Sequence, residues 1–247
     1  MNPLVAPEPF ARDARTALSV NVNKIALPAQ FAHARRAQRG GAVAHRAVLA
    51  GAQGITVHPR PDERHIRART CTSWPRCCAS GPHVEYNIEG NPTHNLMQFV
   101  RELQAAPMHA WCPTAPNSSP PTTAGICLPT LQRLRPLVAE ARALGVRVSL
   151  FMDPLPEAMA HAAELGADRV ELYTEAYAAR ARHTRAGCAC WRVMPRAAQA
   201  AQAVGLGVNA GHDLNRANLH RFPARRAGCA RGVDRPRAGG RRAGARL

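Results

Sequence analysis

The sequence predicts an α/β fold in which parallel strands alternate with helices, and the favoured arrangement is a closed (β/α)8 TIM barrel with extra helices. Short apolar segments typical of strands alternate with amphipathic segments typical of helices. Several helical segments end at a glycine just before the next strand, as at Gly145, Gly166 and Gly205. Polar side chains gather where the strands end, which is where the active sites of such barrels lie.

Six segments have the composition of strands. The first alternates apolar and polar residues, and the second is a short apolar run. The set comprises 18–25, 54–57, 83–89, 146–153, 169–174 and 206–212. The spacing leaves room for one strand within 105–115 and one after 225, which would complete eight units in 247 residues. A doubly wound sheet is the alternative fold, but no Gly-x-Gly-x-x-Gly turn supports it.

Four segments have the periodicity of helices with one apolar face: 95–103, 131–144, 156–165 and 197–204. Other stretches lack a clear period, and they are 28–50, 67–82, 105–130, 180–196 and 221–247. Of these, 105–130 is rich in Pro, Ser and Thr and has the composition of a disordered segment. The order of the elements therefore rests on the well-patterned segments alone.

The length and composition suit one folded domain after a short leader. A hydrophobic content of 46% is enough for a sizeable core, and no run of 18 apolar residues predicts a membrane span. Residues 1–17 lack the basic start and apolar centre of a secretory signal. We expect 1–17 to be a loose leader and 18–247 to form a single barrel domain.

The net charge of +17 raises the possibility of nucleic acid as a partner. The excess arginine concentrates in the stretches without a clear period, Lys24 is the only lysine, and 4% of residues are aromatic. Surfaces that bind nucleic acid normally mix both basic residues and interleave aromatic side chains. Nucleic acid is therefore not the expected partner, although the Arg-rich range 221–247 keeps that alternative open.

The eight cysteines do not predict a metal site. None has Cys-x-x-Cys spacing, and the pair Cys188 and Cys190, separated by one residue, is a weak metal signal. We expect no metal.

The densest set of chemically active side chains lies in 54–66. After the short strand, Pro59 and Pro61 prevent a helix from starting. The loop that follows carries two imidazoles and two guanidiniums, which can bind a phosphorylated ligand and move protons. The sequence therefore predicts a cationic, functional loop at this point.

Similar polar residues lie at or just beyond the ends of other strands. The set comprises Asn21, Asn23, Lys24, His58, Glu89, Asp153, Thr174 and His212. Glu171 lies within a strand, and the alternation of the strand predicts that its side chain points inward. Carboxylates and imidazoles that converge on one barrel mouth can divide the work of general acid and general base.

Six of these segments, in this order, resemble the pyridoxine 5'-phosphate synthase family of vitamin B6 biosynthesis, over a little more than half of the chain. They are SVNVNKIA (19–26), GITVHPRPDERHI (54–66), EYNIEGNP (85–92), RVSLFMD (147–153), VELYT (170–174) and VNAGHDL (208–214). The resemblance implies a cytoplasmic transferase with a (β/α)8 barrel, which usually forms an octamer. It also implies the condensation of 1-deoxy-D-xylulose 5-phosphate with 3-amino-2-oxopropyl phosphate, without a metal or an organic cofactor. The products are pyridoxine 5'-phosphate, phosphate and water.

The resemblance also assigns roles to individual residues. His58 and Glu89 match the proton acceptors of the family, His212 matches its proton donor, and Glu171 matches the carboxylate that stabilises the transition state. The residues that match substrate contacts are Asn21, Asn23, Lys24, Arg60, His65 and Asp213. Many relatives have Asp-His in place of Asn23-Lys24, and many place glycine, next to the phosphate, where this chain has Asp213.

Three features of the family are missing, and all three fall in the stretches without a clear period. They are an Arg-Asn-Ser-Arg-Gly loop, a Thr-rich loop and an Ile-Gly-His-Ala strand end. Codons for 28–33, 69–82, 117–128 and 232–239 exist that, read in another frame, give LRNSR, ADVHELAALLREWP, EQFTSDHGWDL and VSIGHAL. We therefore expect a synthase gene read through compensating frame changes, with an inactive, frame-damaged relative as an alternative.

Overall fold

The computed structural model describes residues 16–23, 36–63, 66–67, 71–72, 84–103, 128–180, 189–219, 222 and 231–234. Most of the leader, 1–15, lies outside these ranges, so the division into leader and single domain stays a prediction.

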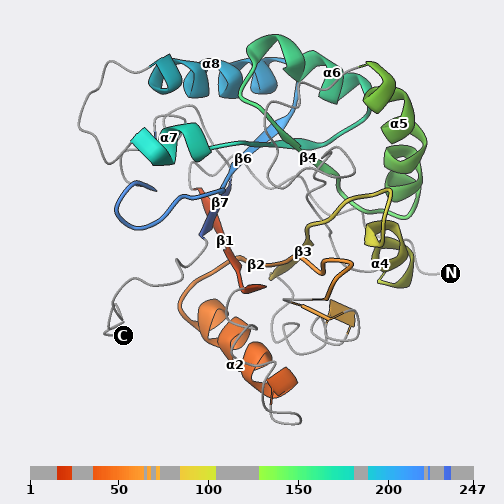
Figure 1. The fold of residues 1–247 in the computed structure, drawn as a ribbon, viewed down its shortest axis with the longest axis vertical. Coiled ribbons are helices and arrows are strands. Elements are labelled where there is room, and N and C mark those ends of the chain that lie inside the picture. The colour runs from red at the N-terminus through yellow and green to blue at the C-terminus, as the bar shows by residue number, and fades with distance from the viewer. Residues whose placement is uncertain are drawn as a thin grey trace, which may run out of the picture.

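Seven parallel strands form one sheet that curves into a ring (Figure 1). They are β1 (Ala17–Asn21), β2 (Gly54–Val57), β3 (Glu85–Ile88), β4 (Ser149–Met152), β5 (Arg169–Leu172), β6 (Gly207–Ala210) and β7 (Arg231–Asp234). Their order across the sheet is β3-β2-β1-β7-β6-β5-β4, and every pairing is parallel. This is the predicted α/β architecture of a barrel.

The strand predicted after residue 225 is confirmed by β7, which pairs with both β1 and β6. The first and last described strands are therefore neighbours, as closure of a barrel requires. Between β3 and β4 the sheet has no described strand, and the chain that joins α4 to α5, 104–127, lies outside the described residues. The strand predicted within 105–115 remains a prediction.

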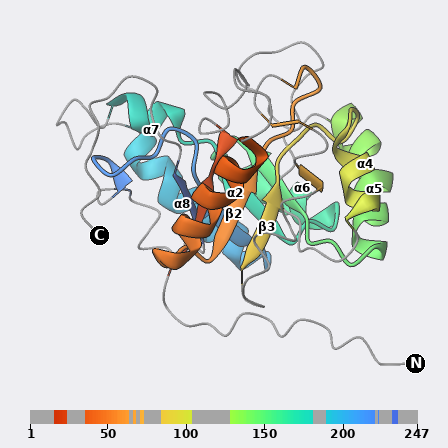
Figure 2. The same ribbon diagram turned by 90° about the horizontal axis from the view of Figure 1, so that it is seen from below.

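Helices lie outside the ring of strands (Figures 1 and 2). They are α2 (Arg36–Leu49), α4 (Leu96–Glu102), α5 (Leu128–Ala143), α6 (Met159–Glu164), α7 (Glu175–Arg180) and α8 (Ala189–Ala203), with a short 3-10 helix, η2 (Pro156–Ala158), before α6. Among the described residues, no helix has the length and apolar character needed to cross a bilayer. Each sequence segment predicted to be helical contains a helix at that place.

Helices extend into several stretches where the sequence shows no clear period, including the start of α5 at Leu128. α2 lies within 28–50, and α8 begins upstream of the predicted start at 197. Met194, Ala198 and Ala201 of α8 are fully buried, so the apolar face continues through the region of Pro195. The proline and the many small alanines weaken the sequence signal without removing the buried face. α7 was not predicted at all.

The glycines predicted to end helices do so. Gly145 follows α5 with a φ of 74°, in the left-handed region that favours glycine. The Val146 N–H donates to the Ala141 carbonyl at 3.0 Å, and the Gly145 N–H donates to the Arg142 carbonyl at 2.9 Å. These two bonds satisfy carbonyls that the helix end would otherwise leave unpaired, and they direct the chain into β4.

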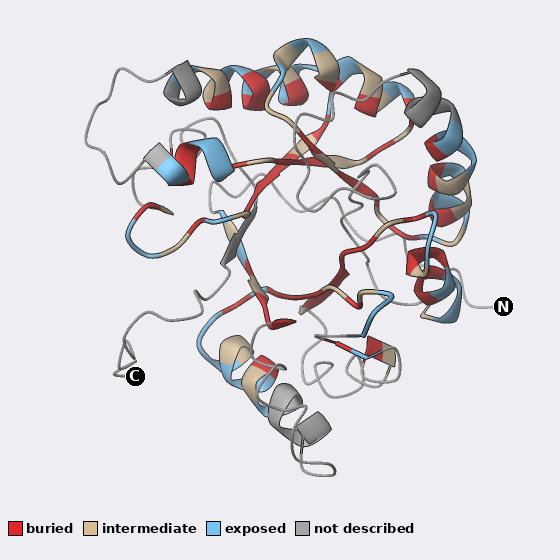
Figure 3. Ribbon diagram, in the orientation of Figure 1, coloured by how far each residue is buried: buried red, intermediate tan, exposed pale blue. Residues whose placement is uncertain are grey.

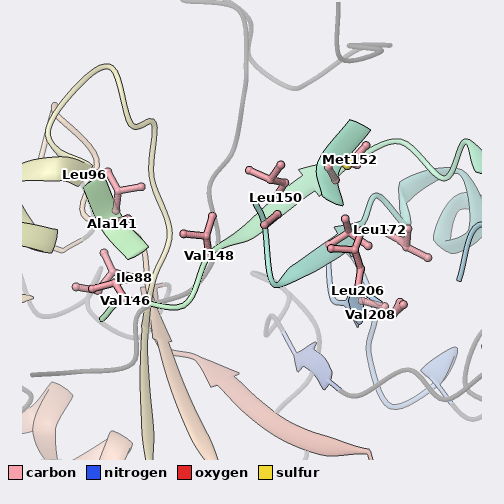
Figure 4. Close-up of a cluster of buried hydrophobic side chains, with 14 of the residues drawn as sticks. Ile88, Leu96, Ala141, Val146, Val148, Leu150, Met152, Leu172, Leu206 and Val208 are labelled. Atoms are coloured by element: carbon pink, nitrogen blue, oxygen red, sulfur yellow. The ribbon is translucent and has the colours of Figure 1, made fainter. Parts of the chain in front are cut away.

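The hydrophobic core lies between the strands and the surrounding helices. Leu150, Leu172 and Val208 come from three neighbouring strands and are fully buried in one cluster (Figure 4). The helices turn their buried faces toward the strands (Figure 3). Burying a side chain of this size stabilises the fold by about 1.5–3 kcal/mol, so this layer is the main source of stability.

The opposite face of the strands is polar. Asn209 Nδ2 of β6 donates to Ser149 Oγ of β4 at 3.2 Å, although β5 lies between these strands. Ser19 and Asn87 both bond to the Thr56 hydroxyl, at 2.7 and 3.0 Å. A bond that skips a strand crosses the inside of the ring, so the polar face is the interior. In β5, for example, Val170 and Leu172 face outward and Glu171 lies on the inner side with Asn209.

Candidate active site

The candidate acid–base residues follow the carboxyl ends of different strands. His58 comes directly after β2, Glu89 directly after β3, and His212 two residues after β6. Because these strands are parallel in one sheet, the three residues lie on the same rim of the ring. β6 lies across the ring from β2 and β3 in Figure 1, so the residues form two groups on one mouth.

The first group is built around Glu89. One of its carboxylate oxygens, Oε2, lies 3.8 Å from His58 Nδ1 and accepts a hydrogen bond from Asn21 Nδ2 at 3.4 Å. The backbone N–H of Glu89 donates to the Val57 carbonyl at 2.7 Å. Glu89 is 6% exposed, so its carboxylate lies at the inner end of the mouth. The structure therefore brings together the two residues predicted to accept protons.

Two asparagines hold this group in place. The His58 N–H donates to Asn23 Oδ1 at 2.7 Å, and the Asn23 N–H donates to Asn21 Oδ1 at 3.1 Å. These bonds join the end of β1 to the end of β2. Both asparagines are buried and lie beside the predicted proton acceptors, and their own contact with substrate remains a prediction.

The loop after β2 is ordered by local contacts. Arg60 Nε lies 3.9 Å from Asp62 Oδ2, and the Arg60 carbonyl accepts from the Glu63 N–H at 2.9 Å. Asn95 Nδ2 donates to the Pro59 carbonyl at 3.2 Å, which joins this loop to the segment after β3. The predicted substrate contacts Lys24 and His65 lie outside the described residues.

The second group is built around His212. Its Nδ1 lies 3.0 Å from Asp213 Oδ2, and its carbonyl accepts a hydrogen bond from the Thr174 hydroxyl. The ring centroid of Tyr173 lies 5.0 Å from that of His212, and the centroid of Phe151 lies 6.1 Å away. His212 thus has an acidic partner on one nitrogen and aromatic neighbours around its ring.

Tyr173 remains a neutral phenol at ordinary pH. Burial raises the pKa of its hydroxyl first, and the effect is increased because the hydroxyl donates to the Glu175 carboxylate and lies near Asp213 and Asp153. Burial also raises the pKa of Asp153, which follows β4. Several carboxyl groups therefore lie near Tyr173 on the His212 side of the mouth.

Glu171 lies inside the ring, below the rim. It is 3% exposed, and its register in the sheet is with Phe151 of β4 and Asn209 of β6. Because Asn209 bonds across the interior, the same side of β5 is the inner side. Its predicted inward direction agrees with this register, and its role in the chemistry stays a prediction.

The two groups can move protons at two positions of a bound ligand. A carboxylate beside an imidazole can accept a proton on one side, and an imidazole beside a carboxylate can donate one on the other. Within the described ranges, no three His, Cys, Asp or Glu side chains are arranged to hold a metal ion. The imidazoles and carboxylates of the two groups supply what general acid–base chemistry needs.

Sequence reasoning missed the aromatic neighbours of His212. Phe151 and Tyr173 were interpreted as ordinary strand residues, although the inward alternation through Ser149 and Phe151 could have indicated that Phe151 faces the mouth. The side chain of Asn218 supports the loop after β6. The sequence did not indicate this role, because a polar residue in a loop has no distinctive pattern.

A ring of parallel strands with acid–base groups at their carboxyl ends defines a TIM-barrel enzyme. Solved structures with this fold agree. An N-acetylmannosamine-6-phosphate 2-epimerase from Clostridium perfringens has a TM-score of 0.53 at 15% identity, over 88% of this chain and 85% of that chain. A putative fructose-1,6-biphosphate aldolase from Coccidioides immitis has a TM-score of 0.57 at 11% identity, over 90% and 77%. At such identities the likeness shows the fold alone.

The family follows from the sequence comparisons. Residues 18–227 match the family described as "Pyridoxal phosphate biosynthesis protein PdxJ", and this chain belongs to that family. The pyridoxine 5'-phosphate synthase of Albidiferax ferrireducens is 49% identical over 212 residues, which cover 84% of this chain and 83% of that protein. The pyridoxine 5'-phosphate synthase of Porphyromonas gingivalis is 40% identical over 218 residues, or 85% of each chain.

Proposed function

We propose that this chain is a pyridoxine 5'-phosphate synthase, which condenses 1-deoxy-D-xylulose 5-phosphate with 3-amino-2-oxopropyl phosphate. The products are pyridoxine 5'-phosphate, phosphate and water. The observation that carries the proposal is the placement of His58, Glu89 and His212 on one rim of the barrel of a PdxJ-family chain. The family resemblance adds the cytoplasm as the place of action and an octamer as the assembly.

The first chemical step is the attack of the amine on the ketone. The new C–N bond forms as the carbonyl oxygen gains a proton, and the nitrogen then loses its extra proton. His58 and Glu89, 3.8 Å apart, accept protons on one side of the mouth. His212 donates the proton that lets the hydroxyl leave as water, which produces the imine.

Ring closure then needs a carbon nucleophile next to the imine. One proton must leave that carbon, and the negative charge that develops must be stabilised until the new C–C bond forms. Glu89 and His58 accept the proton, and the electron pair moves to the protonated imine nitrogen, whose positive charge the buried Glu171 stabilises until then. The same groups return protons when water and phosphate leave.

Binding energy from the two phosphate groups orients the reacting carbons. We propose Arg60 and His65 as contacts to the phosphate of the deoxyxylulose substrate, because guanidinium and imidazolium groups form charge-assisted hydrogen bonds with phosphate oxygens. Asn21, Asn23 and Lys24 are proposed to contact substrate from the end of the first strand. The hydrogen bonds of Asn21 to Glu89 and of Asn23 to the His58 backbone support binding next to the proposed proton acceptors.

The test is the formation of pyridoxine 5'-phosphate from both phosphorylated substrates by the full chain. We expect His212→Ala to lower kcat by about 10²–10⁴-fold, the range for loss of a general acid. His161→Ala is the matched control, because it removes an exposed imidazole on α6 that belongs to neither group. If the wild-type chain folds but forms no product, the inactive, frame-damaged relative is the correct reading.

A further inference from the structure

Asp213 has a backbone conformation that side chains rarely adopt. Its φ is 61°, in the left-handed region, where glycine is the usual residue and Asp is tolerated because it can hydrogen-bond locally. Its carboxylate makes that local bond to the preceding residue, with Oδ2 lying 3.0 Å from His212 Nδ1. The unusual backbone thus comes with a defined contact to a catalytic candidate.

We propose that Asp213 is a positioning residue that orients the His212 ring and sets its tautomer, rather than a contact to substrate. This revises the role assigned to Asp213 from the family resemblance. The expected change in kcat rests on the proposed synthase function. The expected change in the orientation and tautomer of the His212 ring does not.

The tautomer follows from the chemistry of the two groups. An ionised carboxylate can only accept hydrogen bonds, so a neutral His212 bonded to it carries its proton on Nδ1. Nε2 is then the nitrogen that accepts and releases the proton used in the reaction. When His212 is protonated, its positive charge lies next to the Asp213 carboxylate and is stabilised there.

Other described groups near the ring make contacts of other kinds. Tyr173 and Phe151 contact the ring with their aromatic faces or edges, and the Thr174 hydroxyl bonds to the backbone carbonyl of His212. The Glu175 carboxylate accepts the Tyr173 hydroxyl, and Asp153 is a further carboxylate near that phenol. Asp213 is bonded to the imidazole itself.

The loop is held so that the carboxylate and the ring keep this geometry. Asn218 is 6% exposed, and its Nδ2 donates to the Asp213 carbonyl at 3.1 Å. Its Oδ1 accepts from the Asn215 N–H at 2.7 Å, and its carbonyl accepts from the Tyr177 hydroxyl at 2.7 Å. The loop after β6 is therefore anchored to α7 through Tyr177, and little reorganisation is needed to use His212.

A role in holding phosphate fits the carboxylate poorly. Two negative groups in contact repel each other, and the repulsion is stronger where water is partly excluded. The Asp213 side chain is 49% exposed and faces the imidazole, whose charge it can balance. In relatives with glycine at this place the ring would lack this partner, so the feature distinguishes this chain from them.

The direct test is nitrogen NMR of the full chain labelled with [15N]histidine, with His212→Gln to assign the signals. In wild type we expect neutral His212 to carry its proton on Nδ1. In Asp213→Gly, which still tolerates the left-handed backbone, we expect the proton to move largely to Nε2, as in free imidazole. Asp213→Asn, which can still accept from Nδ1, should keep most of the wild-type tautomer.

Kinetics with both substrates give the second readout. Asp213→Gly should lower kcat by roughly 10-fold, a part of the 10²–10⁴ that a general acid contributes, with both KM values within about 2-fold of wild type. Asp213→Asn should recover part of that loss. A raised KM with unchanged kcat would show a substrate contact and overturn the inference, and so would an unchanged tautomer in Asp213→Gly. If wild type forms no product, the synthase proposal fails, and the NMR result still decides the role of Asp213.

Discussion

Tyr173 offers a sharp test of how the mouth supports His212, because one substitution keeps its ring and another removes it. Its ring lies in edge contact with His212, at a centroid distance of 5.0 Å, and with Phe151, at 5.3 Å. Tyr173→Phe keeps both contacts and removes only the hydroxyl that donates to Glu175. Tyr173→Ala removes both contacts.

The expected magnitudes follow from these contacts. An aromatic pair contributes about 0.5–1.5 kcal/mol beyond its buried area, so two pairs together with partial burial give about 2–4 kcal/mol for Tyr173→Ala. At about 2–4 °C per kcal/mol for a chain of this size, Tm should fall by roughly 5–15 °C. Tyr173→Phe loses one hydrogen bond, which corresponds to about 0.5–1.5 kcal/mol and a Tm shift of only a few degrees.

The assays are thermal unfolding and synthase kinetics on both variants. We expect Tyr173→Ala to lower kcat at least 10-fold at a temperature where it is fully folded, because the His212 ring has lost a supporting neighbour. Tyr173→Phe should stay within about 3-fold of wild type, with the alkaline limb of its pH profile unmoved below pH 10, because the raised pKa keeps the phenol neutral there. A folded Tyr173→Ala variant with wild-type kcat would refute the supporting role of the ring.

Three further predictions concern stability and the gene. Thr174→Val removes the fully buried hydroxyl that donates to the His212 carbonyl, and it should cost about 1–3 kcal/mol in urea unfolding; an unchanged midpoint would contradict the bond. Burial raises the pKa of the Cys71 thiol from 9.0 to about 12, so the unfolded chain loses this proton first and the free energy of unfolding falls between those pH values. Cys71→Val should flatten that fall, as measured by urea midpoints against pH. Resequencing the gene should find the alternative frames in the codons for 28–33, 69–82, 117–128 and 232–239; other codons there would exclude frame changes.

The strands could be predicted because their two faces differ so clearly. In β5, the outward Val170 and Leu172 flank the inward Glu171, and that alternation is visible in the sequence alone. The glycines after the helices supplied the boundaries, because a left-handed residue is needed where a helix turns back to the sheet. The order of the strands in the sheet is the sequential order around the ring that the predicted barrel requires.

The helices over 36–49 and 189–196 could not be predicted in the same way. In α2 the buried Ala44 gives only a weak apolar signal because its side chain is small, and α8 contains Pro195. The buried Ala44 and Met194 become informative only once the neighbouring strands are in place. Tertiary contacts decide the structure of these stretches more than local propensity does.

The sequence predicted which residues of the candidate site lie at strand ends. It did not predict the side-chain contacts between those residues and their neighbours. His58, Glu89 and His212 could be placed on one rim because they follow parallel strands. The ring contacts of Phe151 and Tyr173 depend on the register between β4 and β5, which no sequence pattern specifies. The bond between Asp213 and His212 depends on a left-handed backbone that the sequence does not reveal.

The most direct test of the central claim is a titration of the [15N]histidine-labelled full chain with pyridoxine 5'-phosphate. His58 and His212 follow strands on opposite sides of the ring, yet both should act on one bound molecule. We expect the imidazole signals of both residues to shift together, with a single Kd, while the signal of His161 on α6 stays constant. A shift of only one of the two active-site signals, or two different Kd values, would contradict a single pocket shared by the two groups.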